Sequence, residues 1–94
     1  MKIQKQEHGK KGAFFIEKDG EWVAEMTYIK SGEGEITIDH TEVDESIEGE
    51  GIGKDLVAEG VKFARENKLK IVATCPFVKA EIEKNPDYAD VLAG

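Results

Sequence analysis

The sequence has almost no cysteine and no long hydrophobic run. Cys75 is the only cysteine among 94 residues, so no disulfide can form within the chain. One cysteine and two histidines are too few for a usual structural zinc site. No apolar stretch approaches the roughly 20 residues needed to span a membrane, and the first eight residues show no hydrophobic signal region. These absences are expected of a protein of the reducing cytosol that holds no metal and spans no membrane.

Positive charge is also scarce. Thirteen Lys and Arg residues stand against 20 Asp and Glu residues, which gives a net charge of −7 at pH 7. Nucleic acid is therefore not an expected partner, because phosphate binding relies on a cationic surface. A negative field favours cationic amines instead. The length predicts one domain, residues 1–94, and 39% hydrophobic residues are enough for one modest core.

Glycine, in contrast, is concentrated in one stretch, the sequence EGEGIGK at residues 48–54. An alternating strand pattern at 35–43 leads towards it, and a helical pattern at 51–67 follows directly. Without Cβ atoms, such a turn lets the backbone approach a phosphate closely, and the free N–H groups of the first helical turn point at the anion. The helix dipole adds about half a positive charge there. This stretch therefore predicts a site for a pyrophosphate-bearing cofactor, with an ordinary glycine-rich connection as the alternative.

Two common phosphate-binding motifs do not fit this stretch. A P-loop requires Ser or Thr where Asp55 stands, and Gly where Glu48 stands. The third glycine of a dinucleotide-binding motif would fall on Lys54 or Leu56, depending on the starting glycine. A different phosphate-binding loop is therefore needed.

The order of elements predicts an α+β fold. The strands expected from alternation and turn signals are residues 13–18, 21–30, 35–43 and 70–74, and the expected helices are residues 51–67, 77–84 and 87–92. The first three strands should be antiparallel, with a long helix crossing over to a parallel fourth strand and short helices at the C-terminus.

Two details of the core are predicted as well. Trp22, Ala24, Met26 and Tyr28 alternate along the second strand, and we expect them on one face. Gly60 lies on the apolar stripe of the long helix, where glycine costs about 1 kcal/mol of helix propensity relative to alanine. That cost indicates close packing of this helix against the sheet.

Four short motifs in order resemble the GNAT superfamily of N-acetyltransferases. They are HTEV at 40–43, GEGIG at 49–53, CPF at 75–77 and NPDY at 85–88. In the acyl-CoA loop of that superfamily, [QR]-x-x-G-x-[GA], Gly51 and Gly53 match and Glu48 departs from the pattern. The resemblance covers the chain from about residue 12 and is closest to a small, single-domain GNAT-like subfamily. It implies acetyl-CoA or CoA as the cofactor.

The resemblance also implies where that cofactor binds. The pyrophosphate would lie on the backbone of Gly49, Glu50, Gly51, Ile52, Gly53 and Lys54, and the pantetheine arm on the backbone of Thr41, Glu42 and Val43. The thioester would enter where the third and fourth strands splay apart. Two departures stand out: Ile82 takes the place of the Tyr that protonates the leaving thiolate in many GNAT enzymes, and the helices and strands that shape their acceptor pocket have no counterpart here.

His40 and Cys75 are the candidate catalytic residues. We expect His40 to share a strand face with Ile36 and Ile38, where its neutral form can accept a proton. The alternatives are a hydrogen-bonded histidine at a core edge, or Glu42 on the same face as the base. Cys75 precedes a helix, a position that favours the nucleophilic thiolate. It could accept the acetyl group transiently with His40 as base, or simply be a small buried residue.

The function favoured by these features is acetyl transfer from acetyl-CoA to an unidentified amine. A non-catalytic CoA-binding or sensing module, which keeps the cofactor half and lacks the acceptor half, is the alternative. Burial of both His40 and Cys75 would favour that module. A partner protein that completes the acceptor wall is a third reading.

Overall fold

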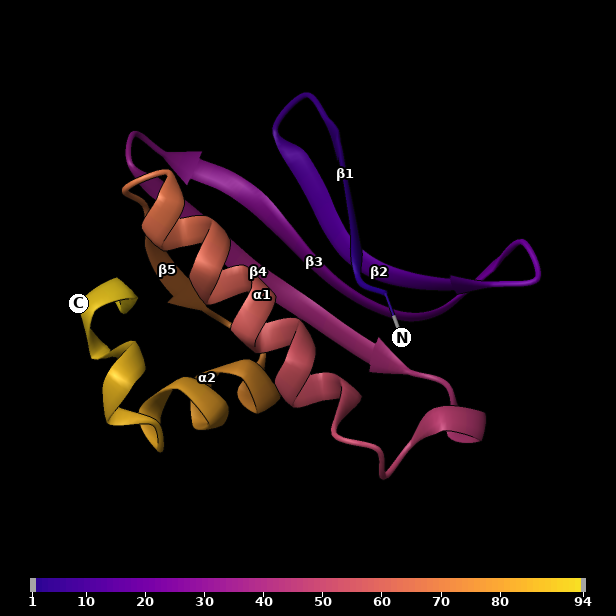
Figure 1. Ribbon diagram of the computed structural model, residues 1–94. Helices are drawn as coiled ribbons and strands as arrows, with labels where there is room; N and C mark the ends of the chain where they lie inside the picture. The colour runs from indigo at the N-terminus through magenta and orange to yellow at the C-terminus, as the bar shows by residue number, and fades with distance from the viewer. Residues whose placement is uncertain (1, 94) are drawn as a thin grey trace.

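Five strands form one curved sheet in the order β1-β2-β3-β4-β5 in the computed structural model, which describes residues 2–93 (Figure 1). The strands are β1 (Gln4–His8), β2 (Lys11–Lys18), β3 (Glu21–Gly32), β4 (Glu35–Val43) and β5 (Lys70–Ala73). The helices are α1 (Ile52–Glu66) and α2 (Pro76–Glu83), with short 3₁₀ segments at Glu45–Ile47 and Pro86–Val91. Among the described residues, no helix is long and apolar enough to cross a membrane.

The predicted α+β fold class is confirmed, including the parallel pairing of β4 and β5 across α1. The number of strands needs one correction. Residues 4–8 form an additional edge strand that pairs with β2, so four antiparallel strands precede α1 instead of three, and the parallel strand is the fifth. The sequence QKQEH lacks apolar alternation because an edge strand that faces solvent does not require it.

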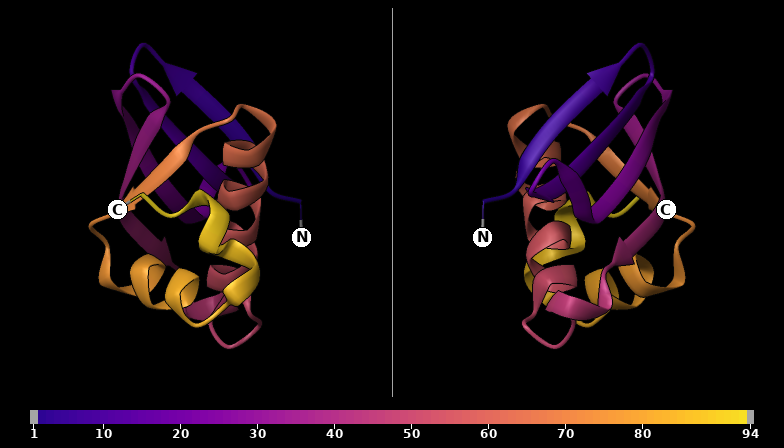
Figure 2. Two further views of the ribbon diagram at one scale, coloured as in Figure 1. Left: turned by 90° about the vertical axis from the view of Figure 1, so that its left-hand side faces the viewer. Right: turned by 90° about the vertical axis from the view of Figure 1, so that its right-hand side faces the viewer.

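Helix α1 packs on one face of the sheet through its apolar stripe. Leu56, Val57, Val61 and Ala64 are all buried in the same cluster as the inward side chains of β2, β3 and β4. A Cβ atom at Gly60 would lie 2.7 Å from Met26 Cε, which confirms the predicted close approach of this helix to the sheet. Helix α2 adds to the same core and lies beside the N-terminal end of α1 (Figure 2). Both helices therefore leave the opposite face of the sheet open.

The prediction for Trp22 is wrong. The register between β2 and β3 shifts after Ile16, so that Trp22 lies opposite Glu17 and not on the inward face with Ala24. Its indole ring stacks on Phe15 at a centroid distance of 4.0 Å, on the open face of the sheet. A bulge inserts one extra residue into a strand, so residues on its two sides no longer follow one alternation. The sequence pattern alone does not reveal this.

Tyr28 is the largest fully buried side chain, and its hydroxyl group ties β1 to the rest of the sheet. The phenol donates a hydrogen bond to Glu7, which also accepts from Lys30 Nζ at 3.2 Å. The hydrogen bond from Tyr28 is the main reason why the pKa of Glu7 lies below its usual range. Burial, and then the Glu7 carboxylate, raise the pKa of Tyr28.

We expect Gly12→Ala to destabilise the fold by about 2 kcal/mol, because overpacking of a rigid core typically costs 1–3 kcal/mol. A Cβ atom at this position would lie 2.2 Å from Tyr28 Cζ, and an aromatic ring cannot bend away as a flexible side chain does. Gly32→Ala is the matched control, since its Cβ would meet nothing nearer than 3.8 Å. Urea unfolding measures both. Equal stability of the two variants would contradict this account of Gly12.

We expect Glu7→Gln to lower the free energy of unfolding at pH 7 and to do so less as the pH falls. The pKa of Glu7 is lower in the folded than in the unfolded chain. Its stabilisation is therefore present above the usual Glu pKa and is lost as the pH falls through the lowered one. Urea unfolding of wild type and variant from pH 7 to pH 2.5 measures this difference. Glu21→Gln, at an exposed hairpin position, is the control, and a pH-independent loss would refute the linkage.

Candidate functional site

Strand β4 separates from β5 at one edge of the sheet. The two strands pair only from Glu35 to Ile38, whereas β4 continues beside β3 as far as Val43. The backbone N–H groups of Thr74 and Cys75 both donate to the carbonyl oxygen of Ile38, at 3.1 and 3.3 Å, and the chain then turns away into α2. Within residues 2–93, no strand therefore pairs with this side of β4 beyond Ile38 (Figure 1). Such an edge offers backbone donors and acceptors to a ligand.

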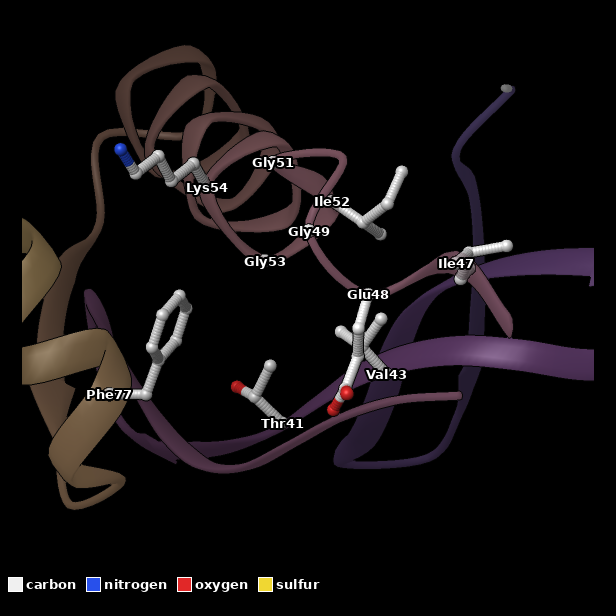
Figure 3. Close-up of a pocket in the computed structure, with 10 residues that line it drawn as sticks. All are labelled: Thr41, Val43, Ile47, Glu48, Gly49, Gly51, Ile52, Gly53, Lys54 and Phe77. Carbon is white, nitrogen blue, oxygen red and sulfur yellow. The ribbon is translucent and has the colours of Figure 1, made fainter. Parts of the chain in front are cut away.

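A cavity of about 410 Å³ lies between this free part of β4 and the first turn of α1. Figure 3 shows the side chains around it. Its lining residues are Thr41, Val43, Ile47, Glu48, Gly49, Gly51, Ile52, Gly53, Lys54 and Phe77. The structure thus brings most of the predicted cofactor residues together around one space. Glu42 and Glu50 are the two predicted residues that do not line it.

The three glycines of the loop serve two different purposes. Gly49 and Gly51 have φ angles of 86° and 75°, in the left-handed region that favours glycine, and an added Cβ atom would meet nothing within 4 Å. Gly53, in contrast, lies in the first turn of α1, and a Cβ atom there would lie 2.7 Å from Phe77 Cζ. The first two glycines permit the turn, and the third leaves room for a neighbouring ring.

The N-terminus of α1 faces the cavity without a side-chain cap. Gly51 is the N-cap residue, and the first helical hydrogen bond runs from Asp55 N to Gly51 O at 3.0 Å. The N–H groups of residues 52–54 therefore have no partner within the helix. Together with the helix dipole and the Lys54 side chain, they make this end of the cavity attractive to an anion.

Glu48 is the acidic residue among those that line the cavity, and its orientation limits its effect on the anion site. Figure 3 shows its side chain turned towards β4 and Val43, away from the first turn of α1. Glu48 lines the cavity but does not occupy the position in front of the free N–H groups. Its negative charge opposes anion binding at a distance, whereas Lys54 favours it.

The predicted strand face of His40 is wrong, because β4 contains a bulge. Ile38 lies opposite Tyr28, but His40 lies opposite Thr27, the very next residue, so Asp39 is the extra residue. The bulge moves His40 to the open face of the sheet, away from Ile36 and Ile38, which are fully buried under α1. It also places Thr41 and Val43 on the helix face, where they line the cavity.

His40 and Glu42 form a pair on the open face, as their shared strand side predicts. His40 Nε2 lies 3.3 Å from Glu42 Oε2, and the two side chains are 53% and 71% exposed. An ionised carboxylate can only accept a hydrogen bond, so this contact is a hydrogen bond in the tautomer whose Nε2 carries the hydrogen. Nδ1 is then the nitrogen that can accept a proton. This arrangement is suited to a general base oriented by a carboxylate.

Cys75 lies on the other side of β4. It is the N-cap residue of α2, as its position before Pro76 predicts, and it is only 9% exposed. Its Sγ lies 3.7 Å from Thr41 Oγ1, across the mouth of the gap between β4 and β5. The structure does not bring Cys75 and His40 together, because they belong to opposite faces of the sheet. Their catalytic roles stay predictions.

Sequence reasoning missed two residues of the cavity, Ile47 and Phe77. Ile47 is a buried residue of the 3₁₀ segment before the glycine loop, where the pattern gave no signal. Phe77 belongs to the CPF motif, and an apolar ring directly after a helix start could have drawn attention to it.

Comparisons of the sequence and of the fold with known proteins point to the same family. The family model described as GCN5-related N-acetyltransferase matches residues 13–91. Protein NATD1 of Xenopus tropicalis is 32% identical over 63 residues, which cover 67% of this chain and 58% of that protein. Human protein NATD1 is also 32% identical over 63 residues, and 56% of it is covered. The chain thus spans just over half the length of these curated relatives.

Solved structures extend the comparison to the whole chain. The solution structure of a GCN5-like protein from Staphylococcus aureus is 40% identical, has a TM-score of 0.75, and is matched over 99% of this chain and 88% of that chain. Ribosomal-protein-alanine N-acetyltransferase from Brucella melitensis, at 22% identity and a TM-score of 0.62, shares the fold over 90% of this chain and 62% of its own. This protein belongs to the GCN5-related N-acetyltransferase family.

Proposed function

We propose that this protein binds acetyl-CoA and transfers the acetyl group to an amine. The observation that carries the proposal is the cavity between the uncapped N-terminus of α1 and the unpaired edge of β4. CoA has a pyrophosphate at one end of a long arm with amide groups. The free N–H groups of residues 52–54 suit the pyrophosphate, and the backbone of residues 41–43 suits the amides. The thioester then reaches the gap between β4 and β5.

The open face of the sheet is the side from which the acceptor approaches. Helices α1 and α2 cover the other face, and the cavity that we propose for the cofactor lies on that side. The amine nitrogen attacks the thioester carbonyl carbon, the C–S bond breaks, and CoA leaves as the thiolate. The amine proton passes to His40 Nδ1, while Glu42 holds the ring through Nε2. A cationic amine suits the net charge of −7, and it gives its extra proton to solvent before it attacks.

The position of Cys75 also permits a variant of this mechanism, in which the acetyl group passes through the Cys75 thiol. The thiol lies beside the gap, within 3.7 Å of the Thr41 hydroxyl. In this route the Cys75 sulfur attacks the thioester carbonyl, the C–S bond to CoA breaks, and the thiol proton passes to the departing CoA thiolate. The amine then attacks the acetyl carbonyl on Cys75, and the amine proton returns to the released Cys75 sulfur. We favour direct transfer, because the only imidazole near the gap in the described chain faces away from this thiol.

A non-catalytic CoA-binding module is the second candidate, and Ile82 is the observation in its favour. This residue stands where the resemblance places the Tyr that protonates the leaving thiolate, and it is 2% exposed in the apolar core. It can neither donate a proton nor reach the cavity. In contrast, the burial expected of both candidate catalytic residues in such a module holds for Cys75 alone, since His40 is exposed.

Cofactor binding is tested with a pair of charge changes of opposite sign. We expect Lys54→Gln to weaken CoA binding by about three- to fivefold and Glu48→Gln to strengthen it by a similar factor, since a partly exposed charge contributes about 0.5–1 kcal/mol. Lys62→Gln, about two turns further along α1, is the control. Amide NMR shifts during CoA titration should centre on residues 49–54 and 41–43. No shifts with millimolar CoA would refute the proposed site.

Catalysis is tested by thioester turnover with a panel of amines. We expect His40→Gln to lower kcat/KM by about 100-fold, the usual range for loss of a general base, and Cys75→Ala to lower it far less. Intact-mass measurement after exposure to acetyl-CoA should show no acetyl group on Cys75. An adduct that disappears in Cys75→Ala, together with loss of turnover, would establish the covalent route. CoA binding without turnover of any amine would identify the non-catalytic module.

A further inference from the structure

Phe77 is one of two large hydrophobic side chains exposed in residues 2–93, and it is exposed at the edge of the cavity. It follows Pro76 in the first turn of α2, and the residue is 44% exposed. The other such residue, Trp22, is stacked on Phe15 on the open face of the sheet. Phe77 has no comparable aromatic partner among the described residues. Its ring instead rests on the backbone of α1 at Gly53.

Glycine at position 53 is explained by this ring. A Cβ atom there would lie 2.7 Å from Phe77 Cζ and 2.9 Å from Cε2, closer than real Cβ contacts. The backbone of Gly53 is ordinary helix, so no left-handed conformation requires glycine. Glycine lowers helix propensity relative to alanine. Glycine therefore stands at position 53 because the Phe77 ring contacts α1 there and leaves no room for a Cβ atom. The ring lies between the N-termini of α1 and α2.

The position of the ring bears on any ligand that extends from α1 to β4. Figure 3 shows Phe77 across the cavity from Thr41, next to the first turn of α1. One end of the cavity is the anion-attracting turn at residues 52–54, and the other is the edge of β4 at residues 41–43. The ring lines the cavity together with both ends, so a chain molecule that joins these ends lies beside the ring.

We propose that Phe77, seated on Gly53, is the wall that holds the pantetheine arm of an acyl-CoA against the edge of β4. The inference rests on the proposed function, because it assumes that the cavity takes a CoA ester. The arm covers the exposed part of the ring, and this burial adds affinity. The ring also keeps the arm close enough to β4 for its amides to bond to the strand. Phe77 thereby contributes to binding of the arm and not of the nucleotide.

The contributions of the arm and of the nucleotide to binding are distinguished by comparing two ligands. These are CoA and 3′-phospho-ADP, which is CoA without its pantetheine. We expect Phe77→Ala to weaken CoA binding about tenfold in isothermal titration and to change 3′-phospho-ADP binding by less than about twofold. Trp22→Ala is the matched control, since it removes the other exposed ring and lies outside the cavity. It should leave both affinities unchanged. Amide spectra of each variant establish that it is folded.

A double-mutant cycle tests the role of Gly53. We expect Gly53→Ala to weaken CoA binding in the wild-type background, because the new methyl group displaces the ring. The same change should have no effect on CoA binding in the Phe77→Ala background, where the conflict is absent. If Gly53 served only the close approach of a phosphate, Gly53→Ala would weaken both ligands equally in both backgrounds.

The outcomes also distinguish this inference from the proposed function. Wild-type protein that binds neither CoA nor 3′-phospho-ADP would overturn both. Wild-type protein that binds CoA, with Phe77→Ala unchanged towards it, would overturn only the role of Phe77. Equal weakening of CoA and 3′-phospho-ADP by Phe77→Ala would also overturn it, since the ring would then act on the nucleotide or on the fold.

Discussion

The separation of β4 from β5 after Ile38 is the constraint on which the rest of the site depends. Strand β5 is only four residues long, and the chain leaves it through two hydrogen bonds to the same carbonyl oxygen. The remainder of β4 is thereby left with an unpaired edge along which Thr41 and Val43 are half-buried. Unpaired backbone groups in such a place are costly unless water or a ligand satisfies them. The cavity beside this edge supplies the space for both.

Helix α1 determines how its anion-attracting first turn lies relative to this edge, because the helix is one rigid element packed on the sheet. Its apolar stripe and Gly60 fix it closely on the sheet, and this contact fixes where its uncapped first turn points. The left-handed glycines before it let the chain turn sharply into the helix, so that the free N–H groups face β4. The ring of Phe77 then fills the angle between α1 and α2. Packing far from the cavity thus determines its geometry.

The sheet also divides the candidate chemistry between its two faces. The cavity, Thr41 and Cys75 lie on the helix face, and the His40–Glu42 pair lies on the open face. The unpaired edge of β4 lies between them. A donor bound on one face and an acceptor arriving from the other would therefore meet in the plane of the sheet. This division favours direct transfer over a relay between the thiol and the imidazole.

The sequence by itself determined the element types, the α+β class, the turn at the glycine loop and its neighbours, because these follow from local periodicity and from residues with special backbone freedom. It did not determine the polar strand β1, the faces of Trp22 and His40, or the contact between Phe77 and Gly53. The face on which a side chain lies depends on how many residues separate successive pairs along the strand. A bulge changes that number, and it forms only against a neighbouring strand. Residues 24 positions apart touch only through packing of the two helices, so tertiary structure alone decided which side chains share the site.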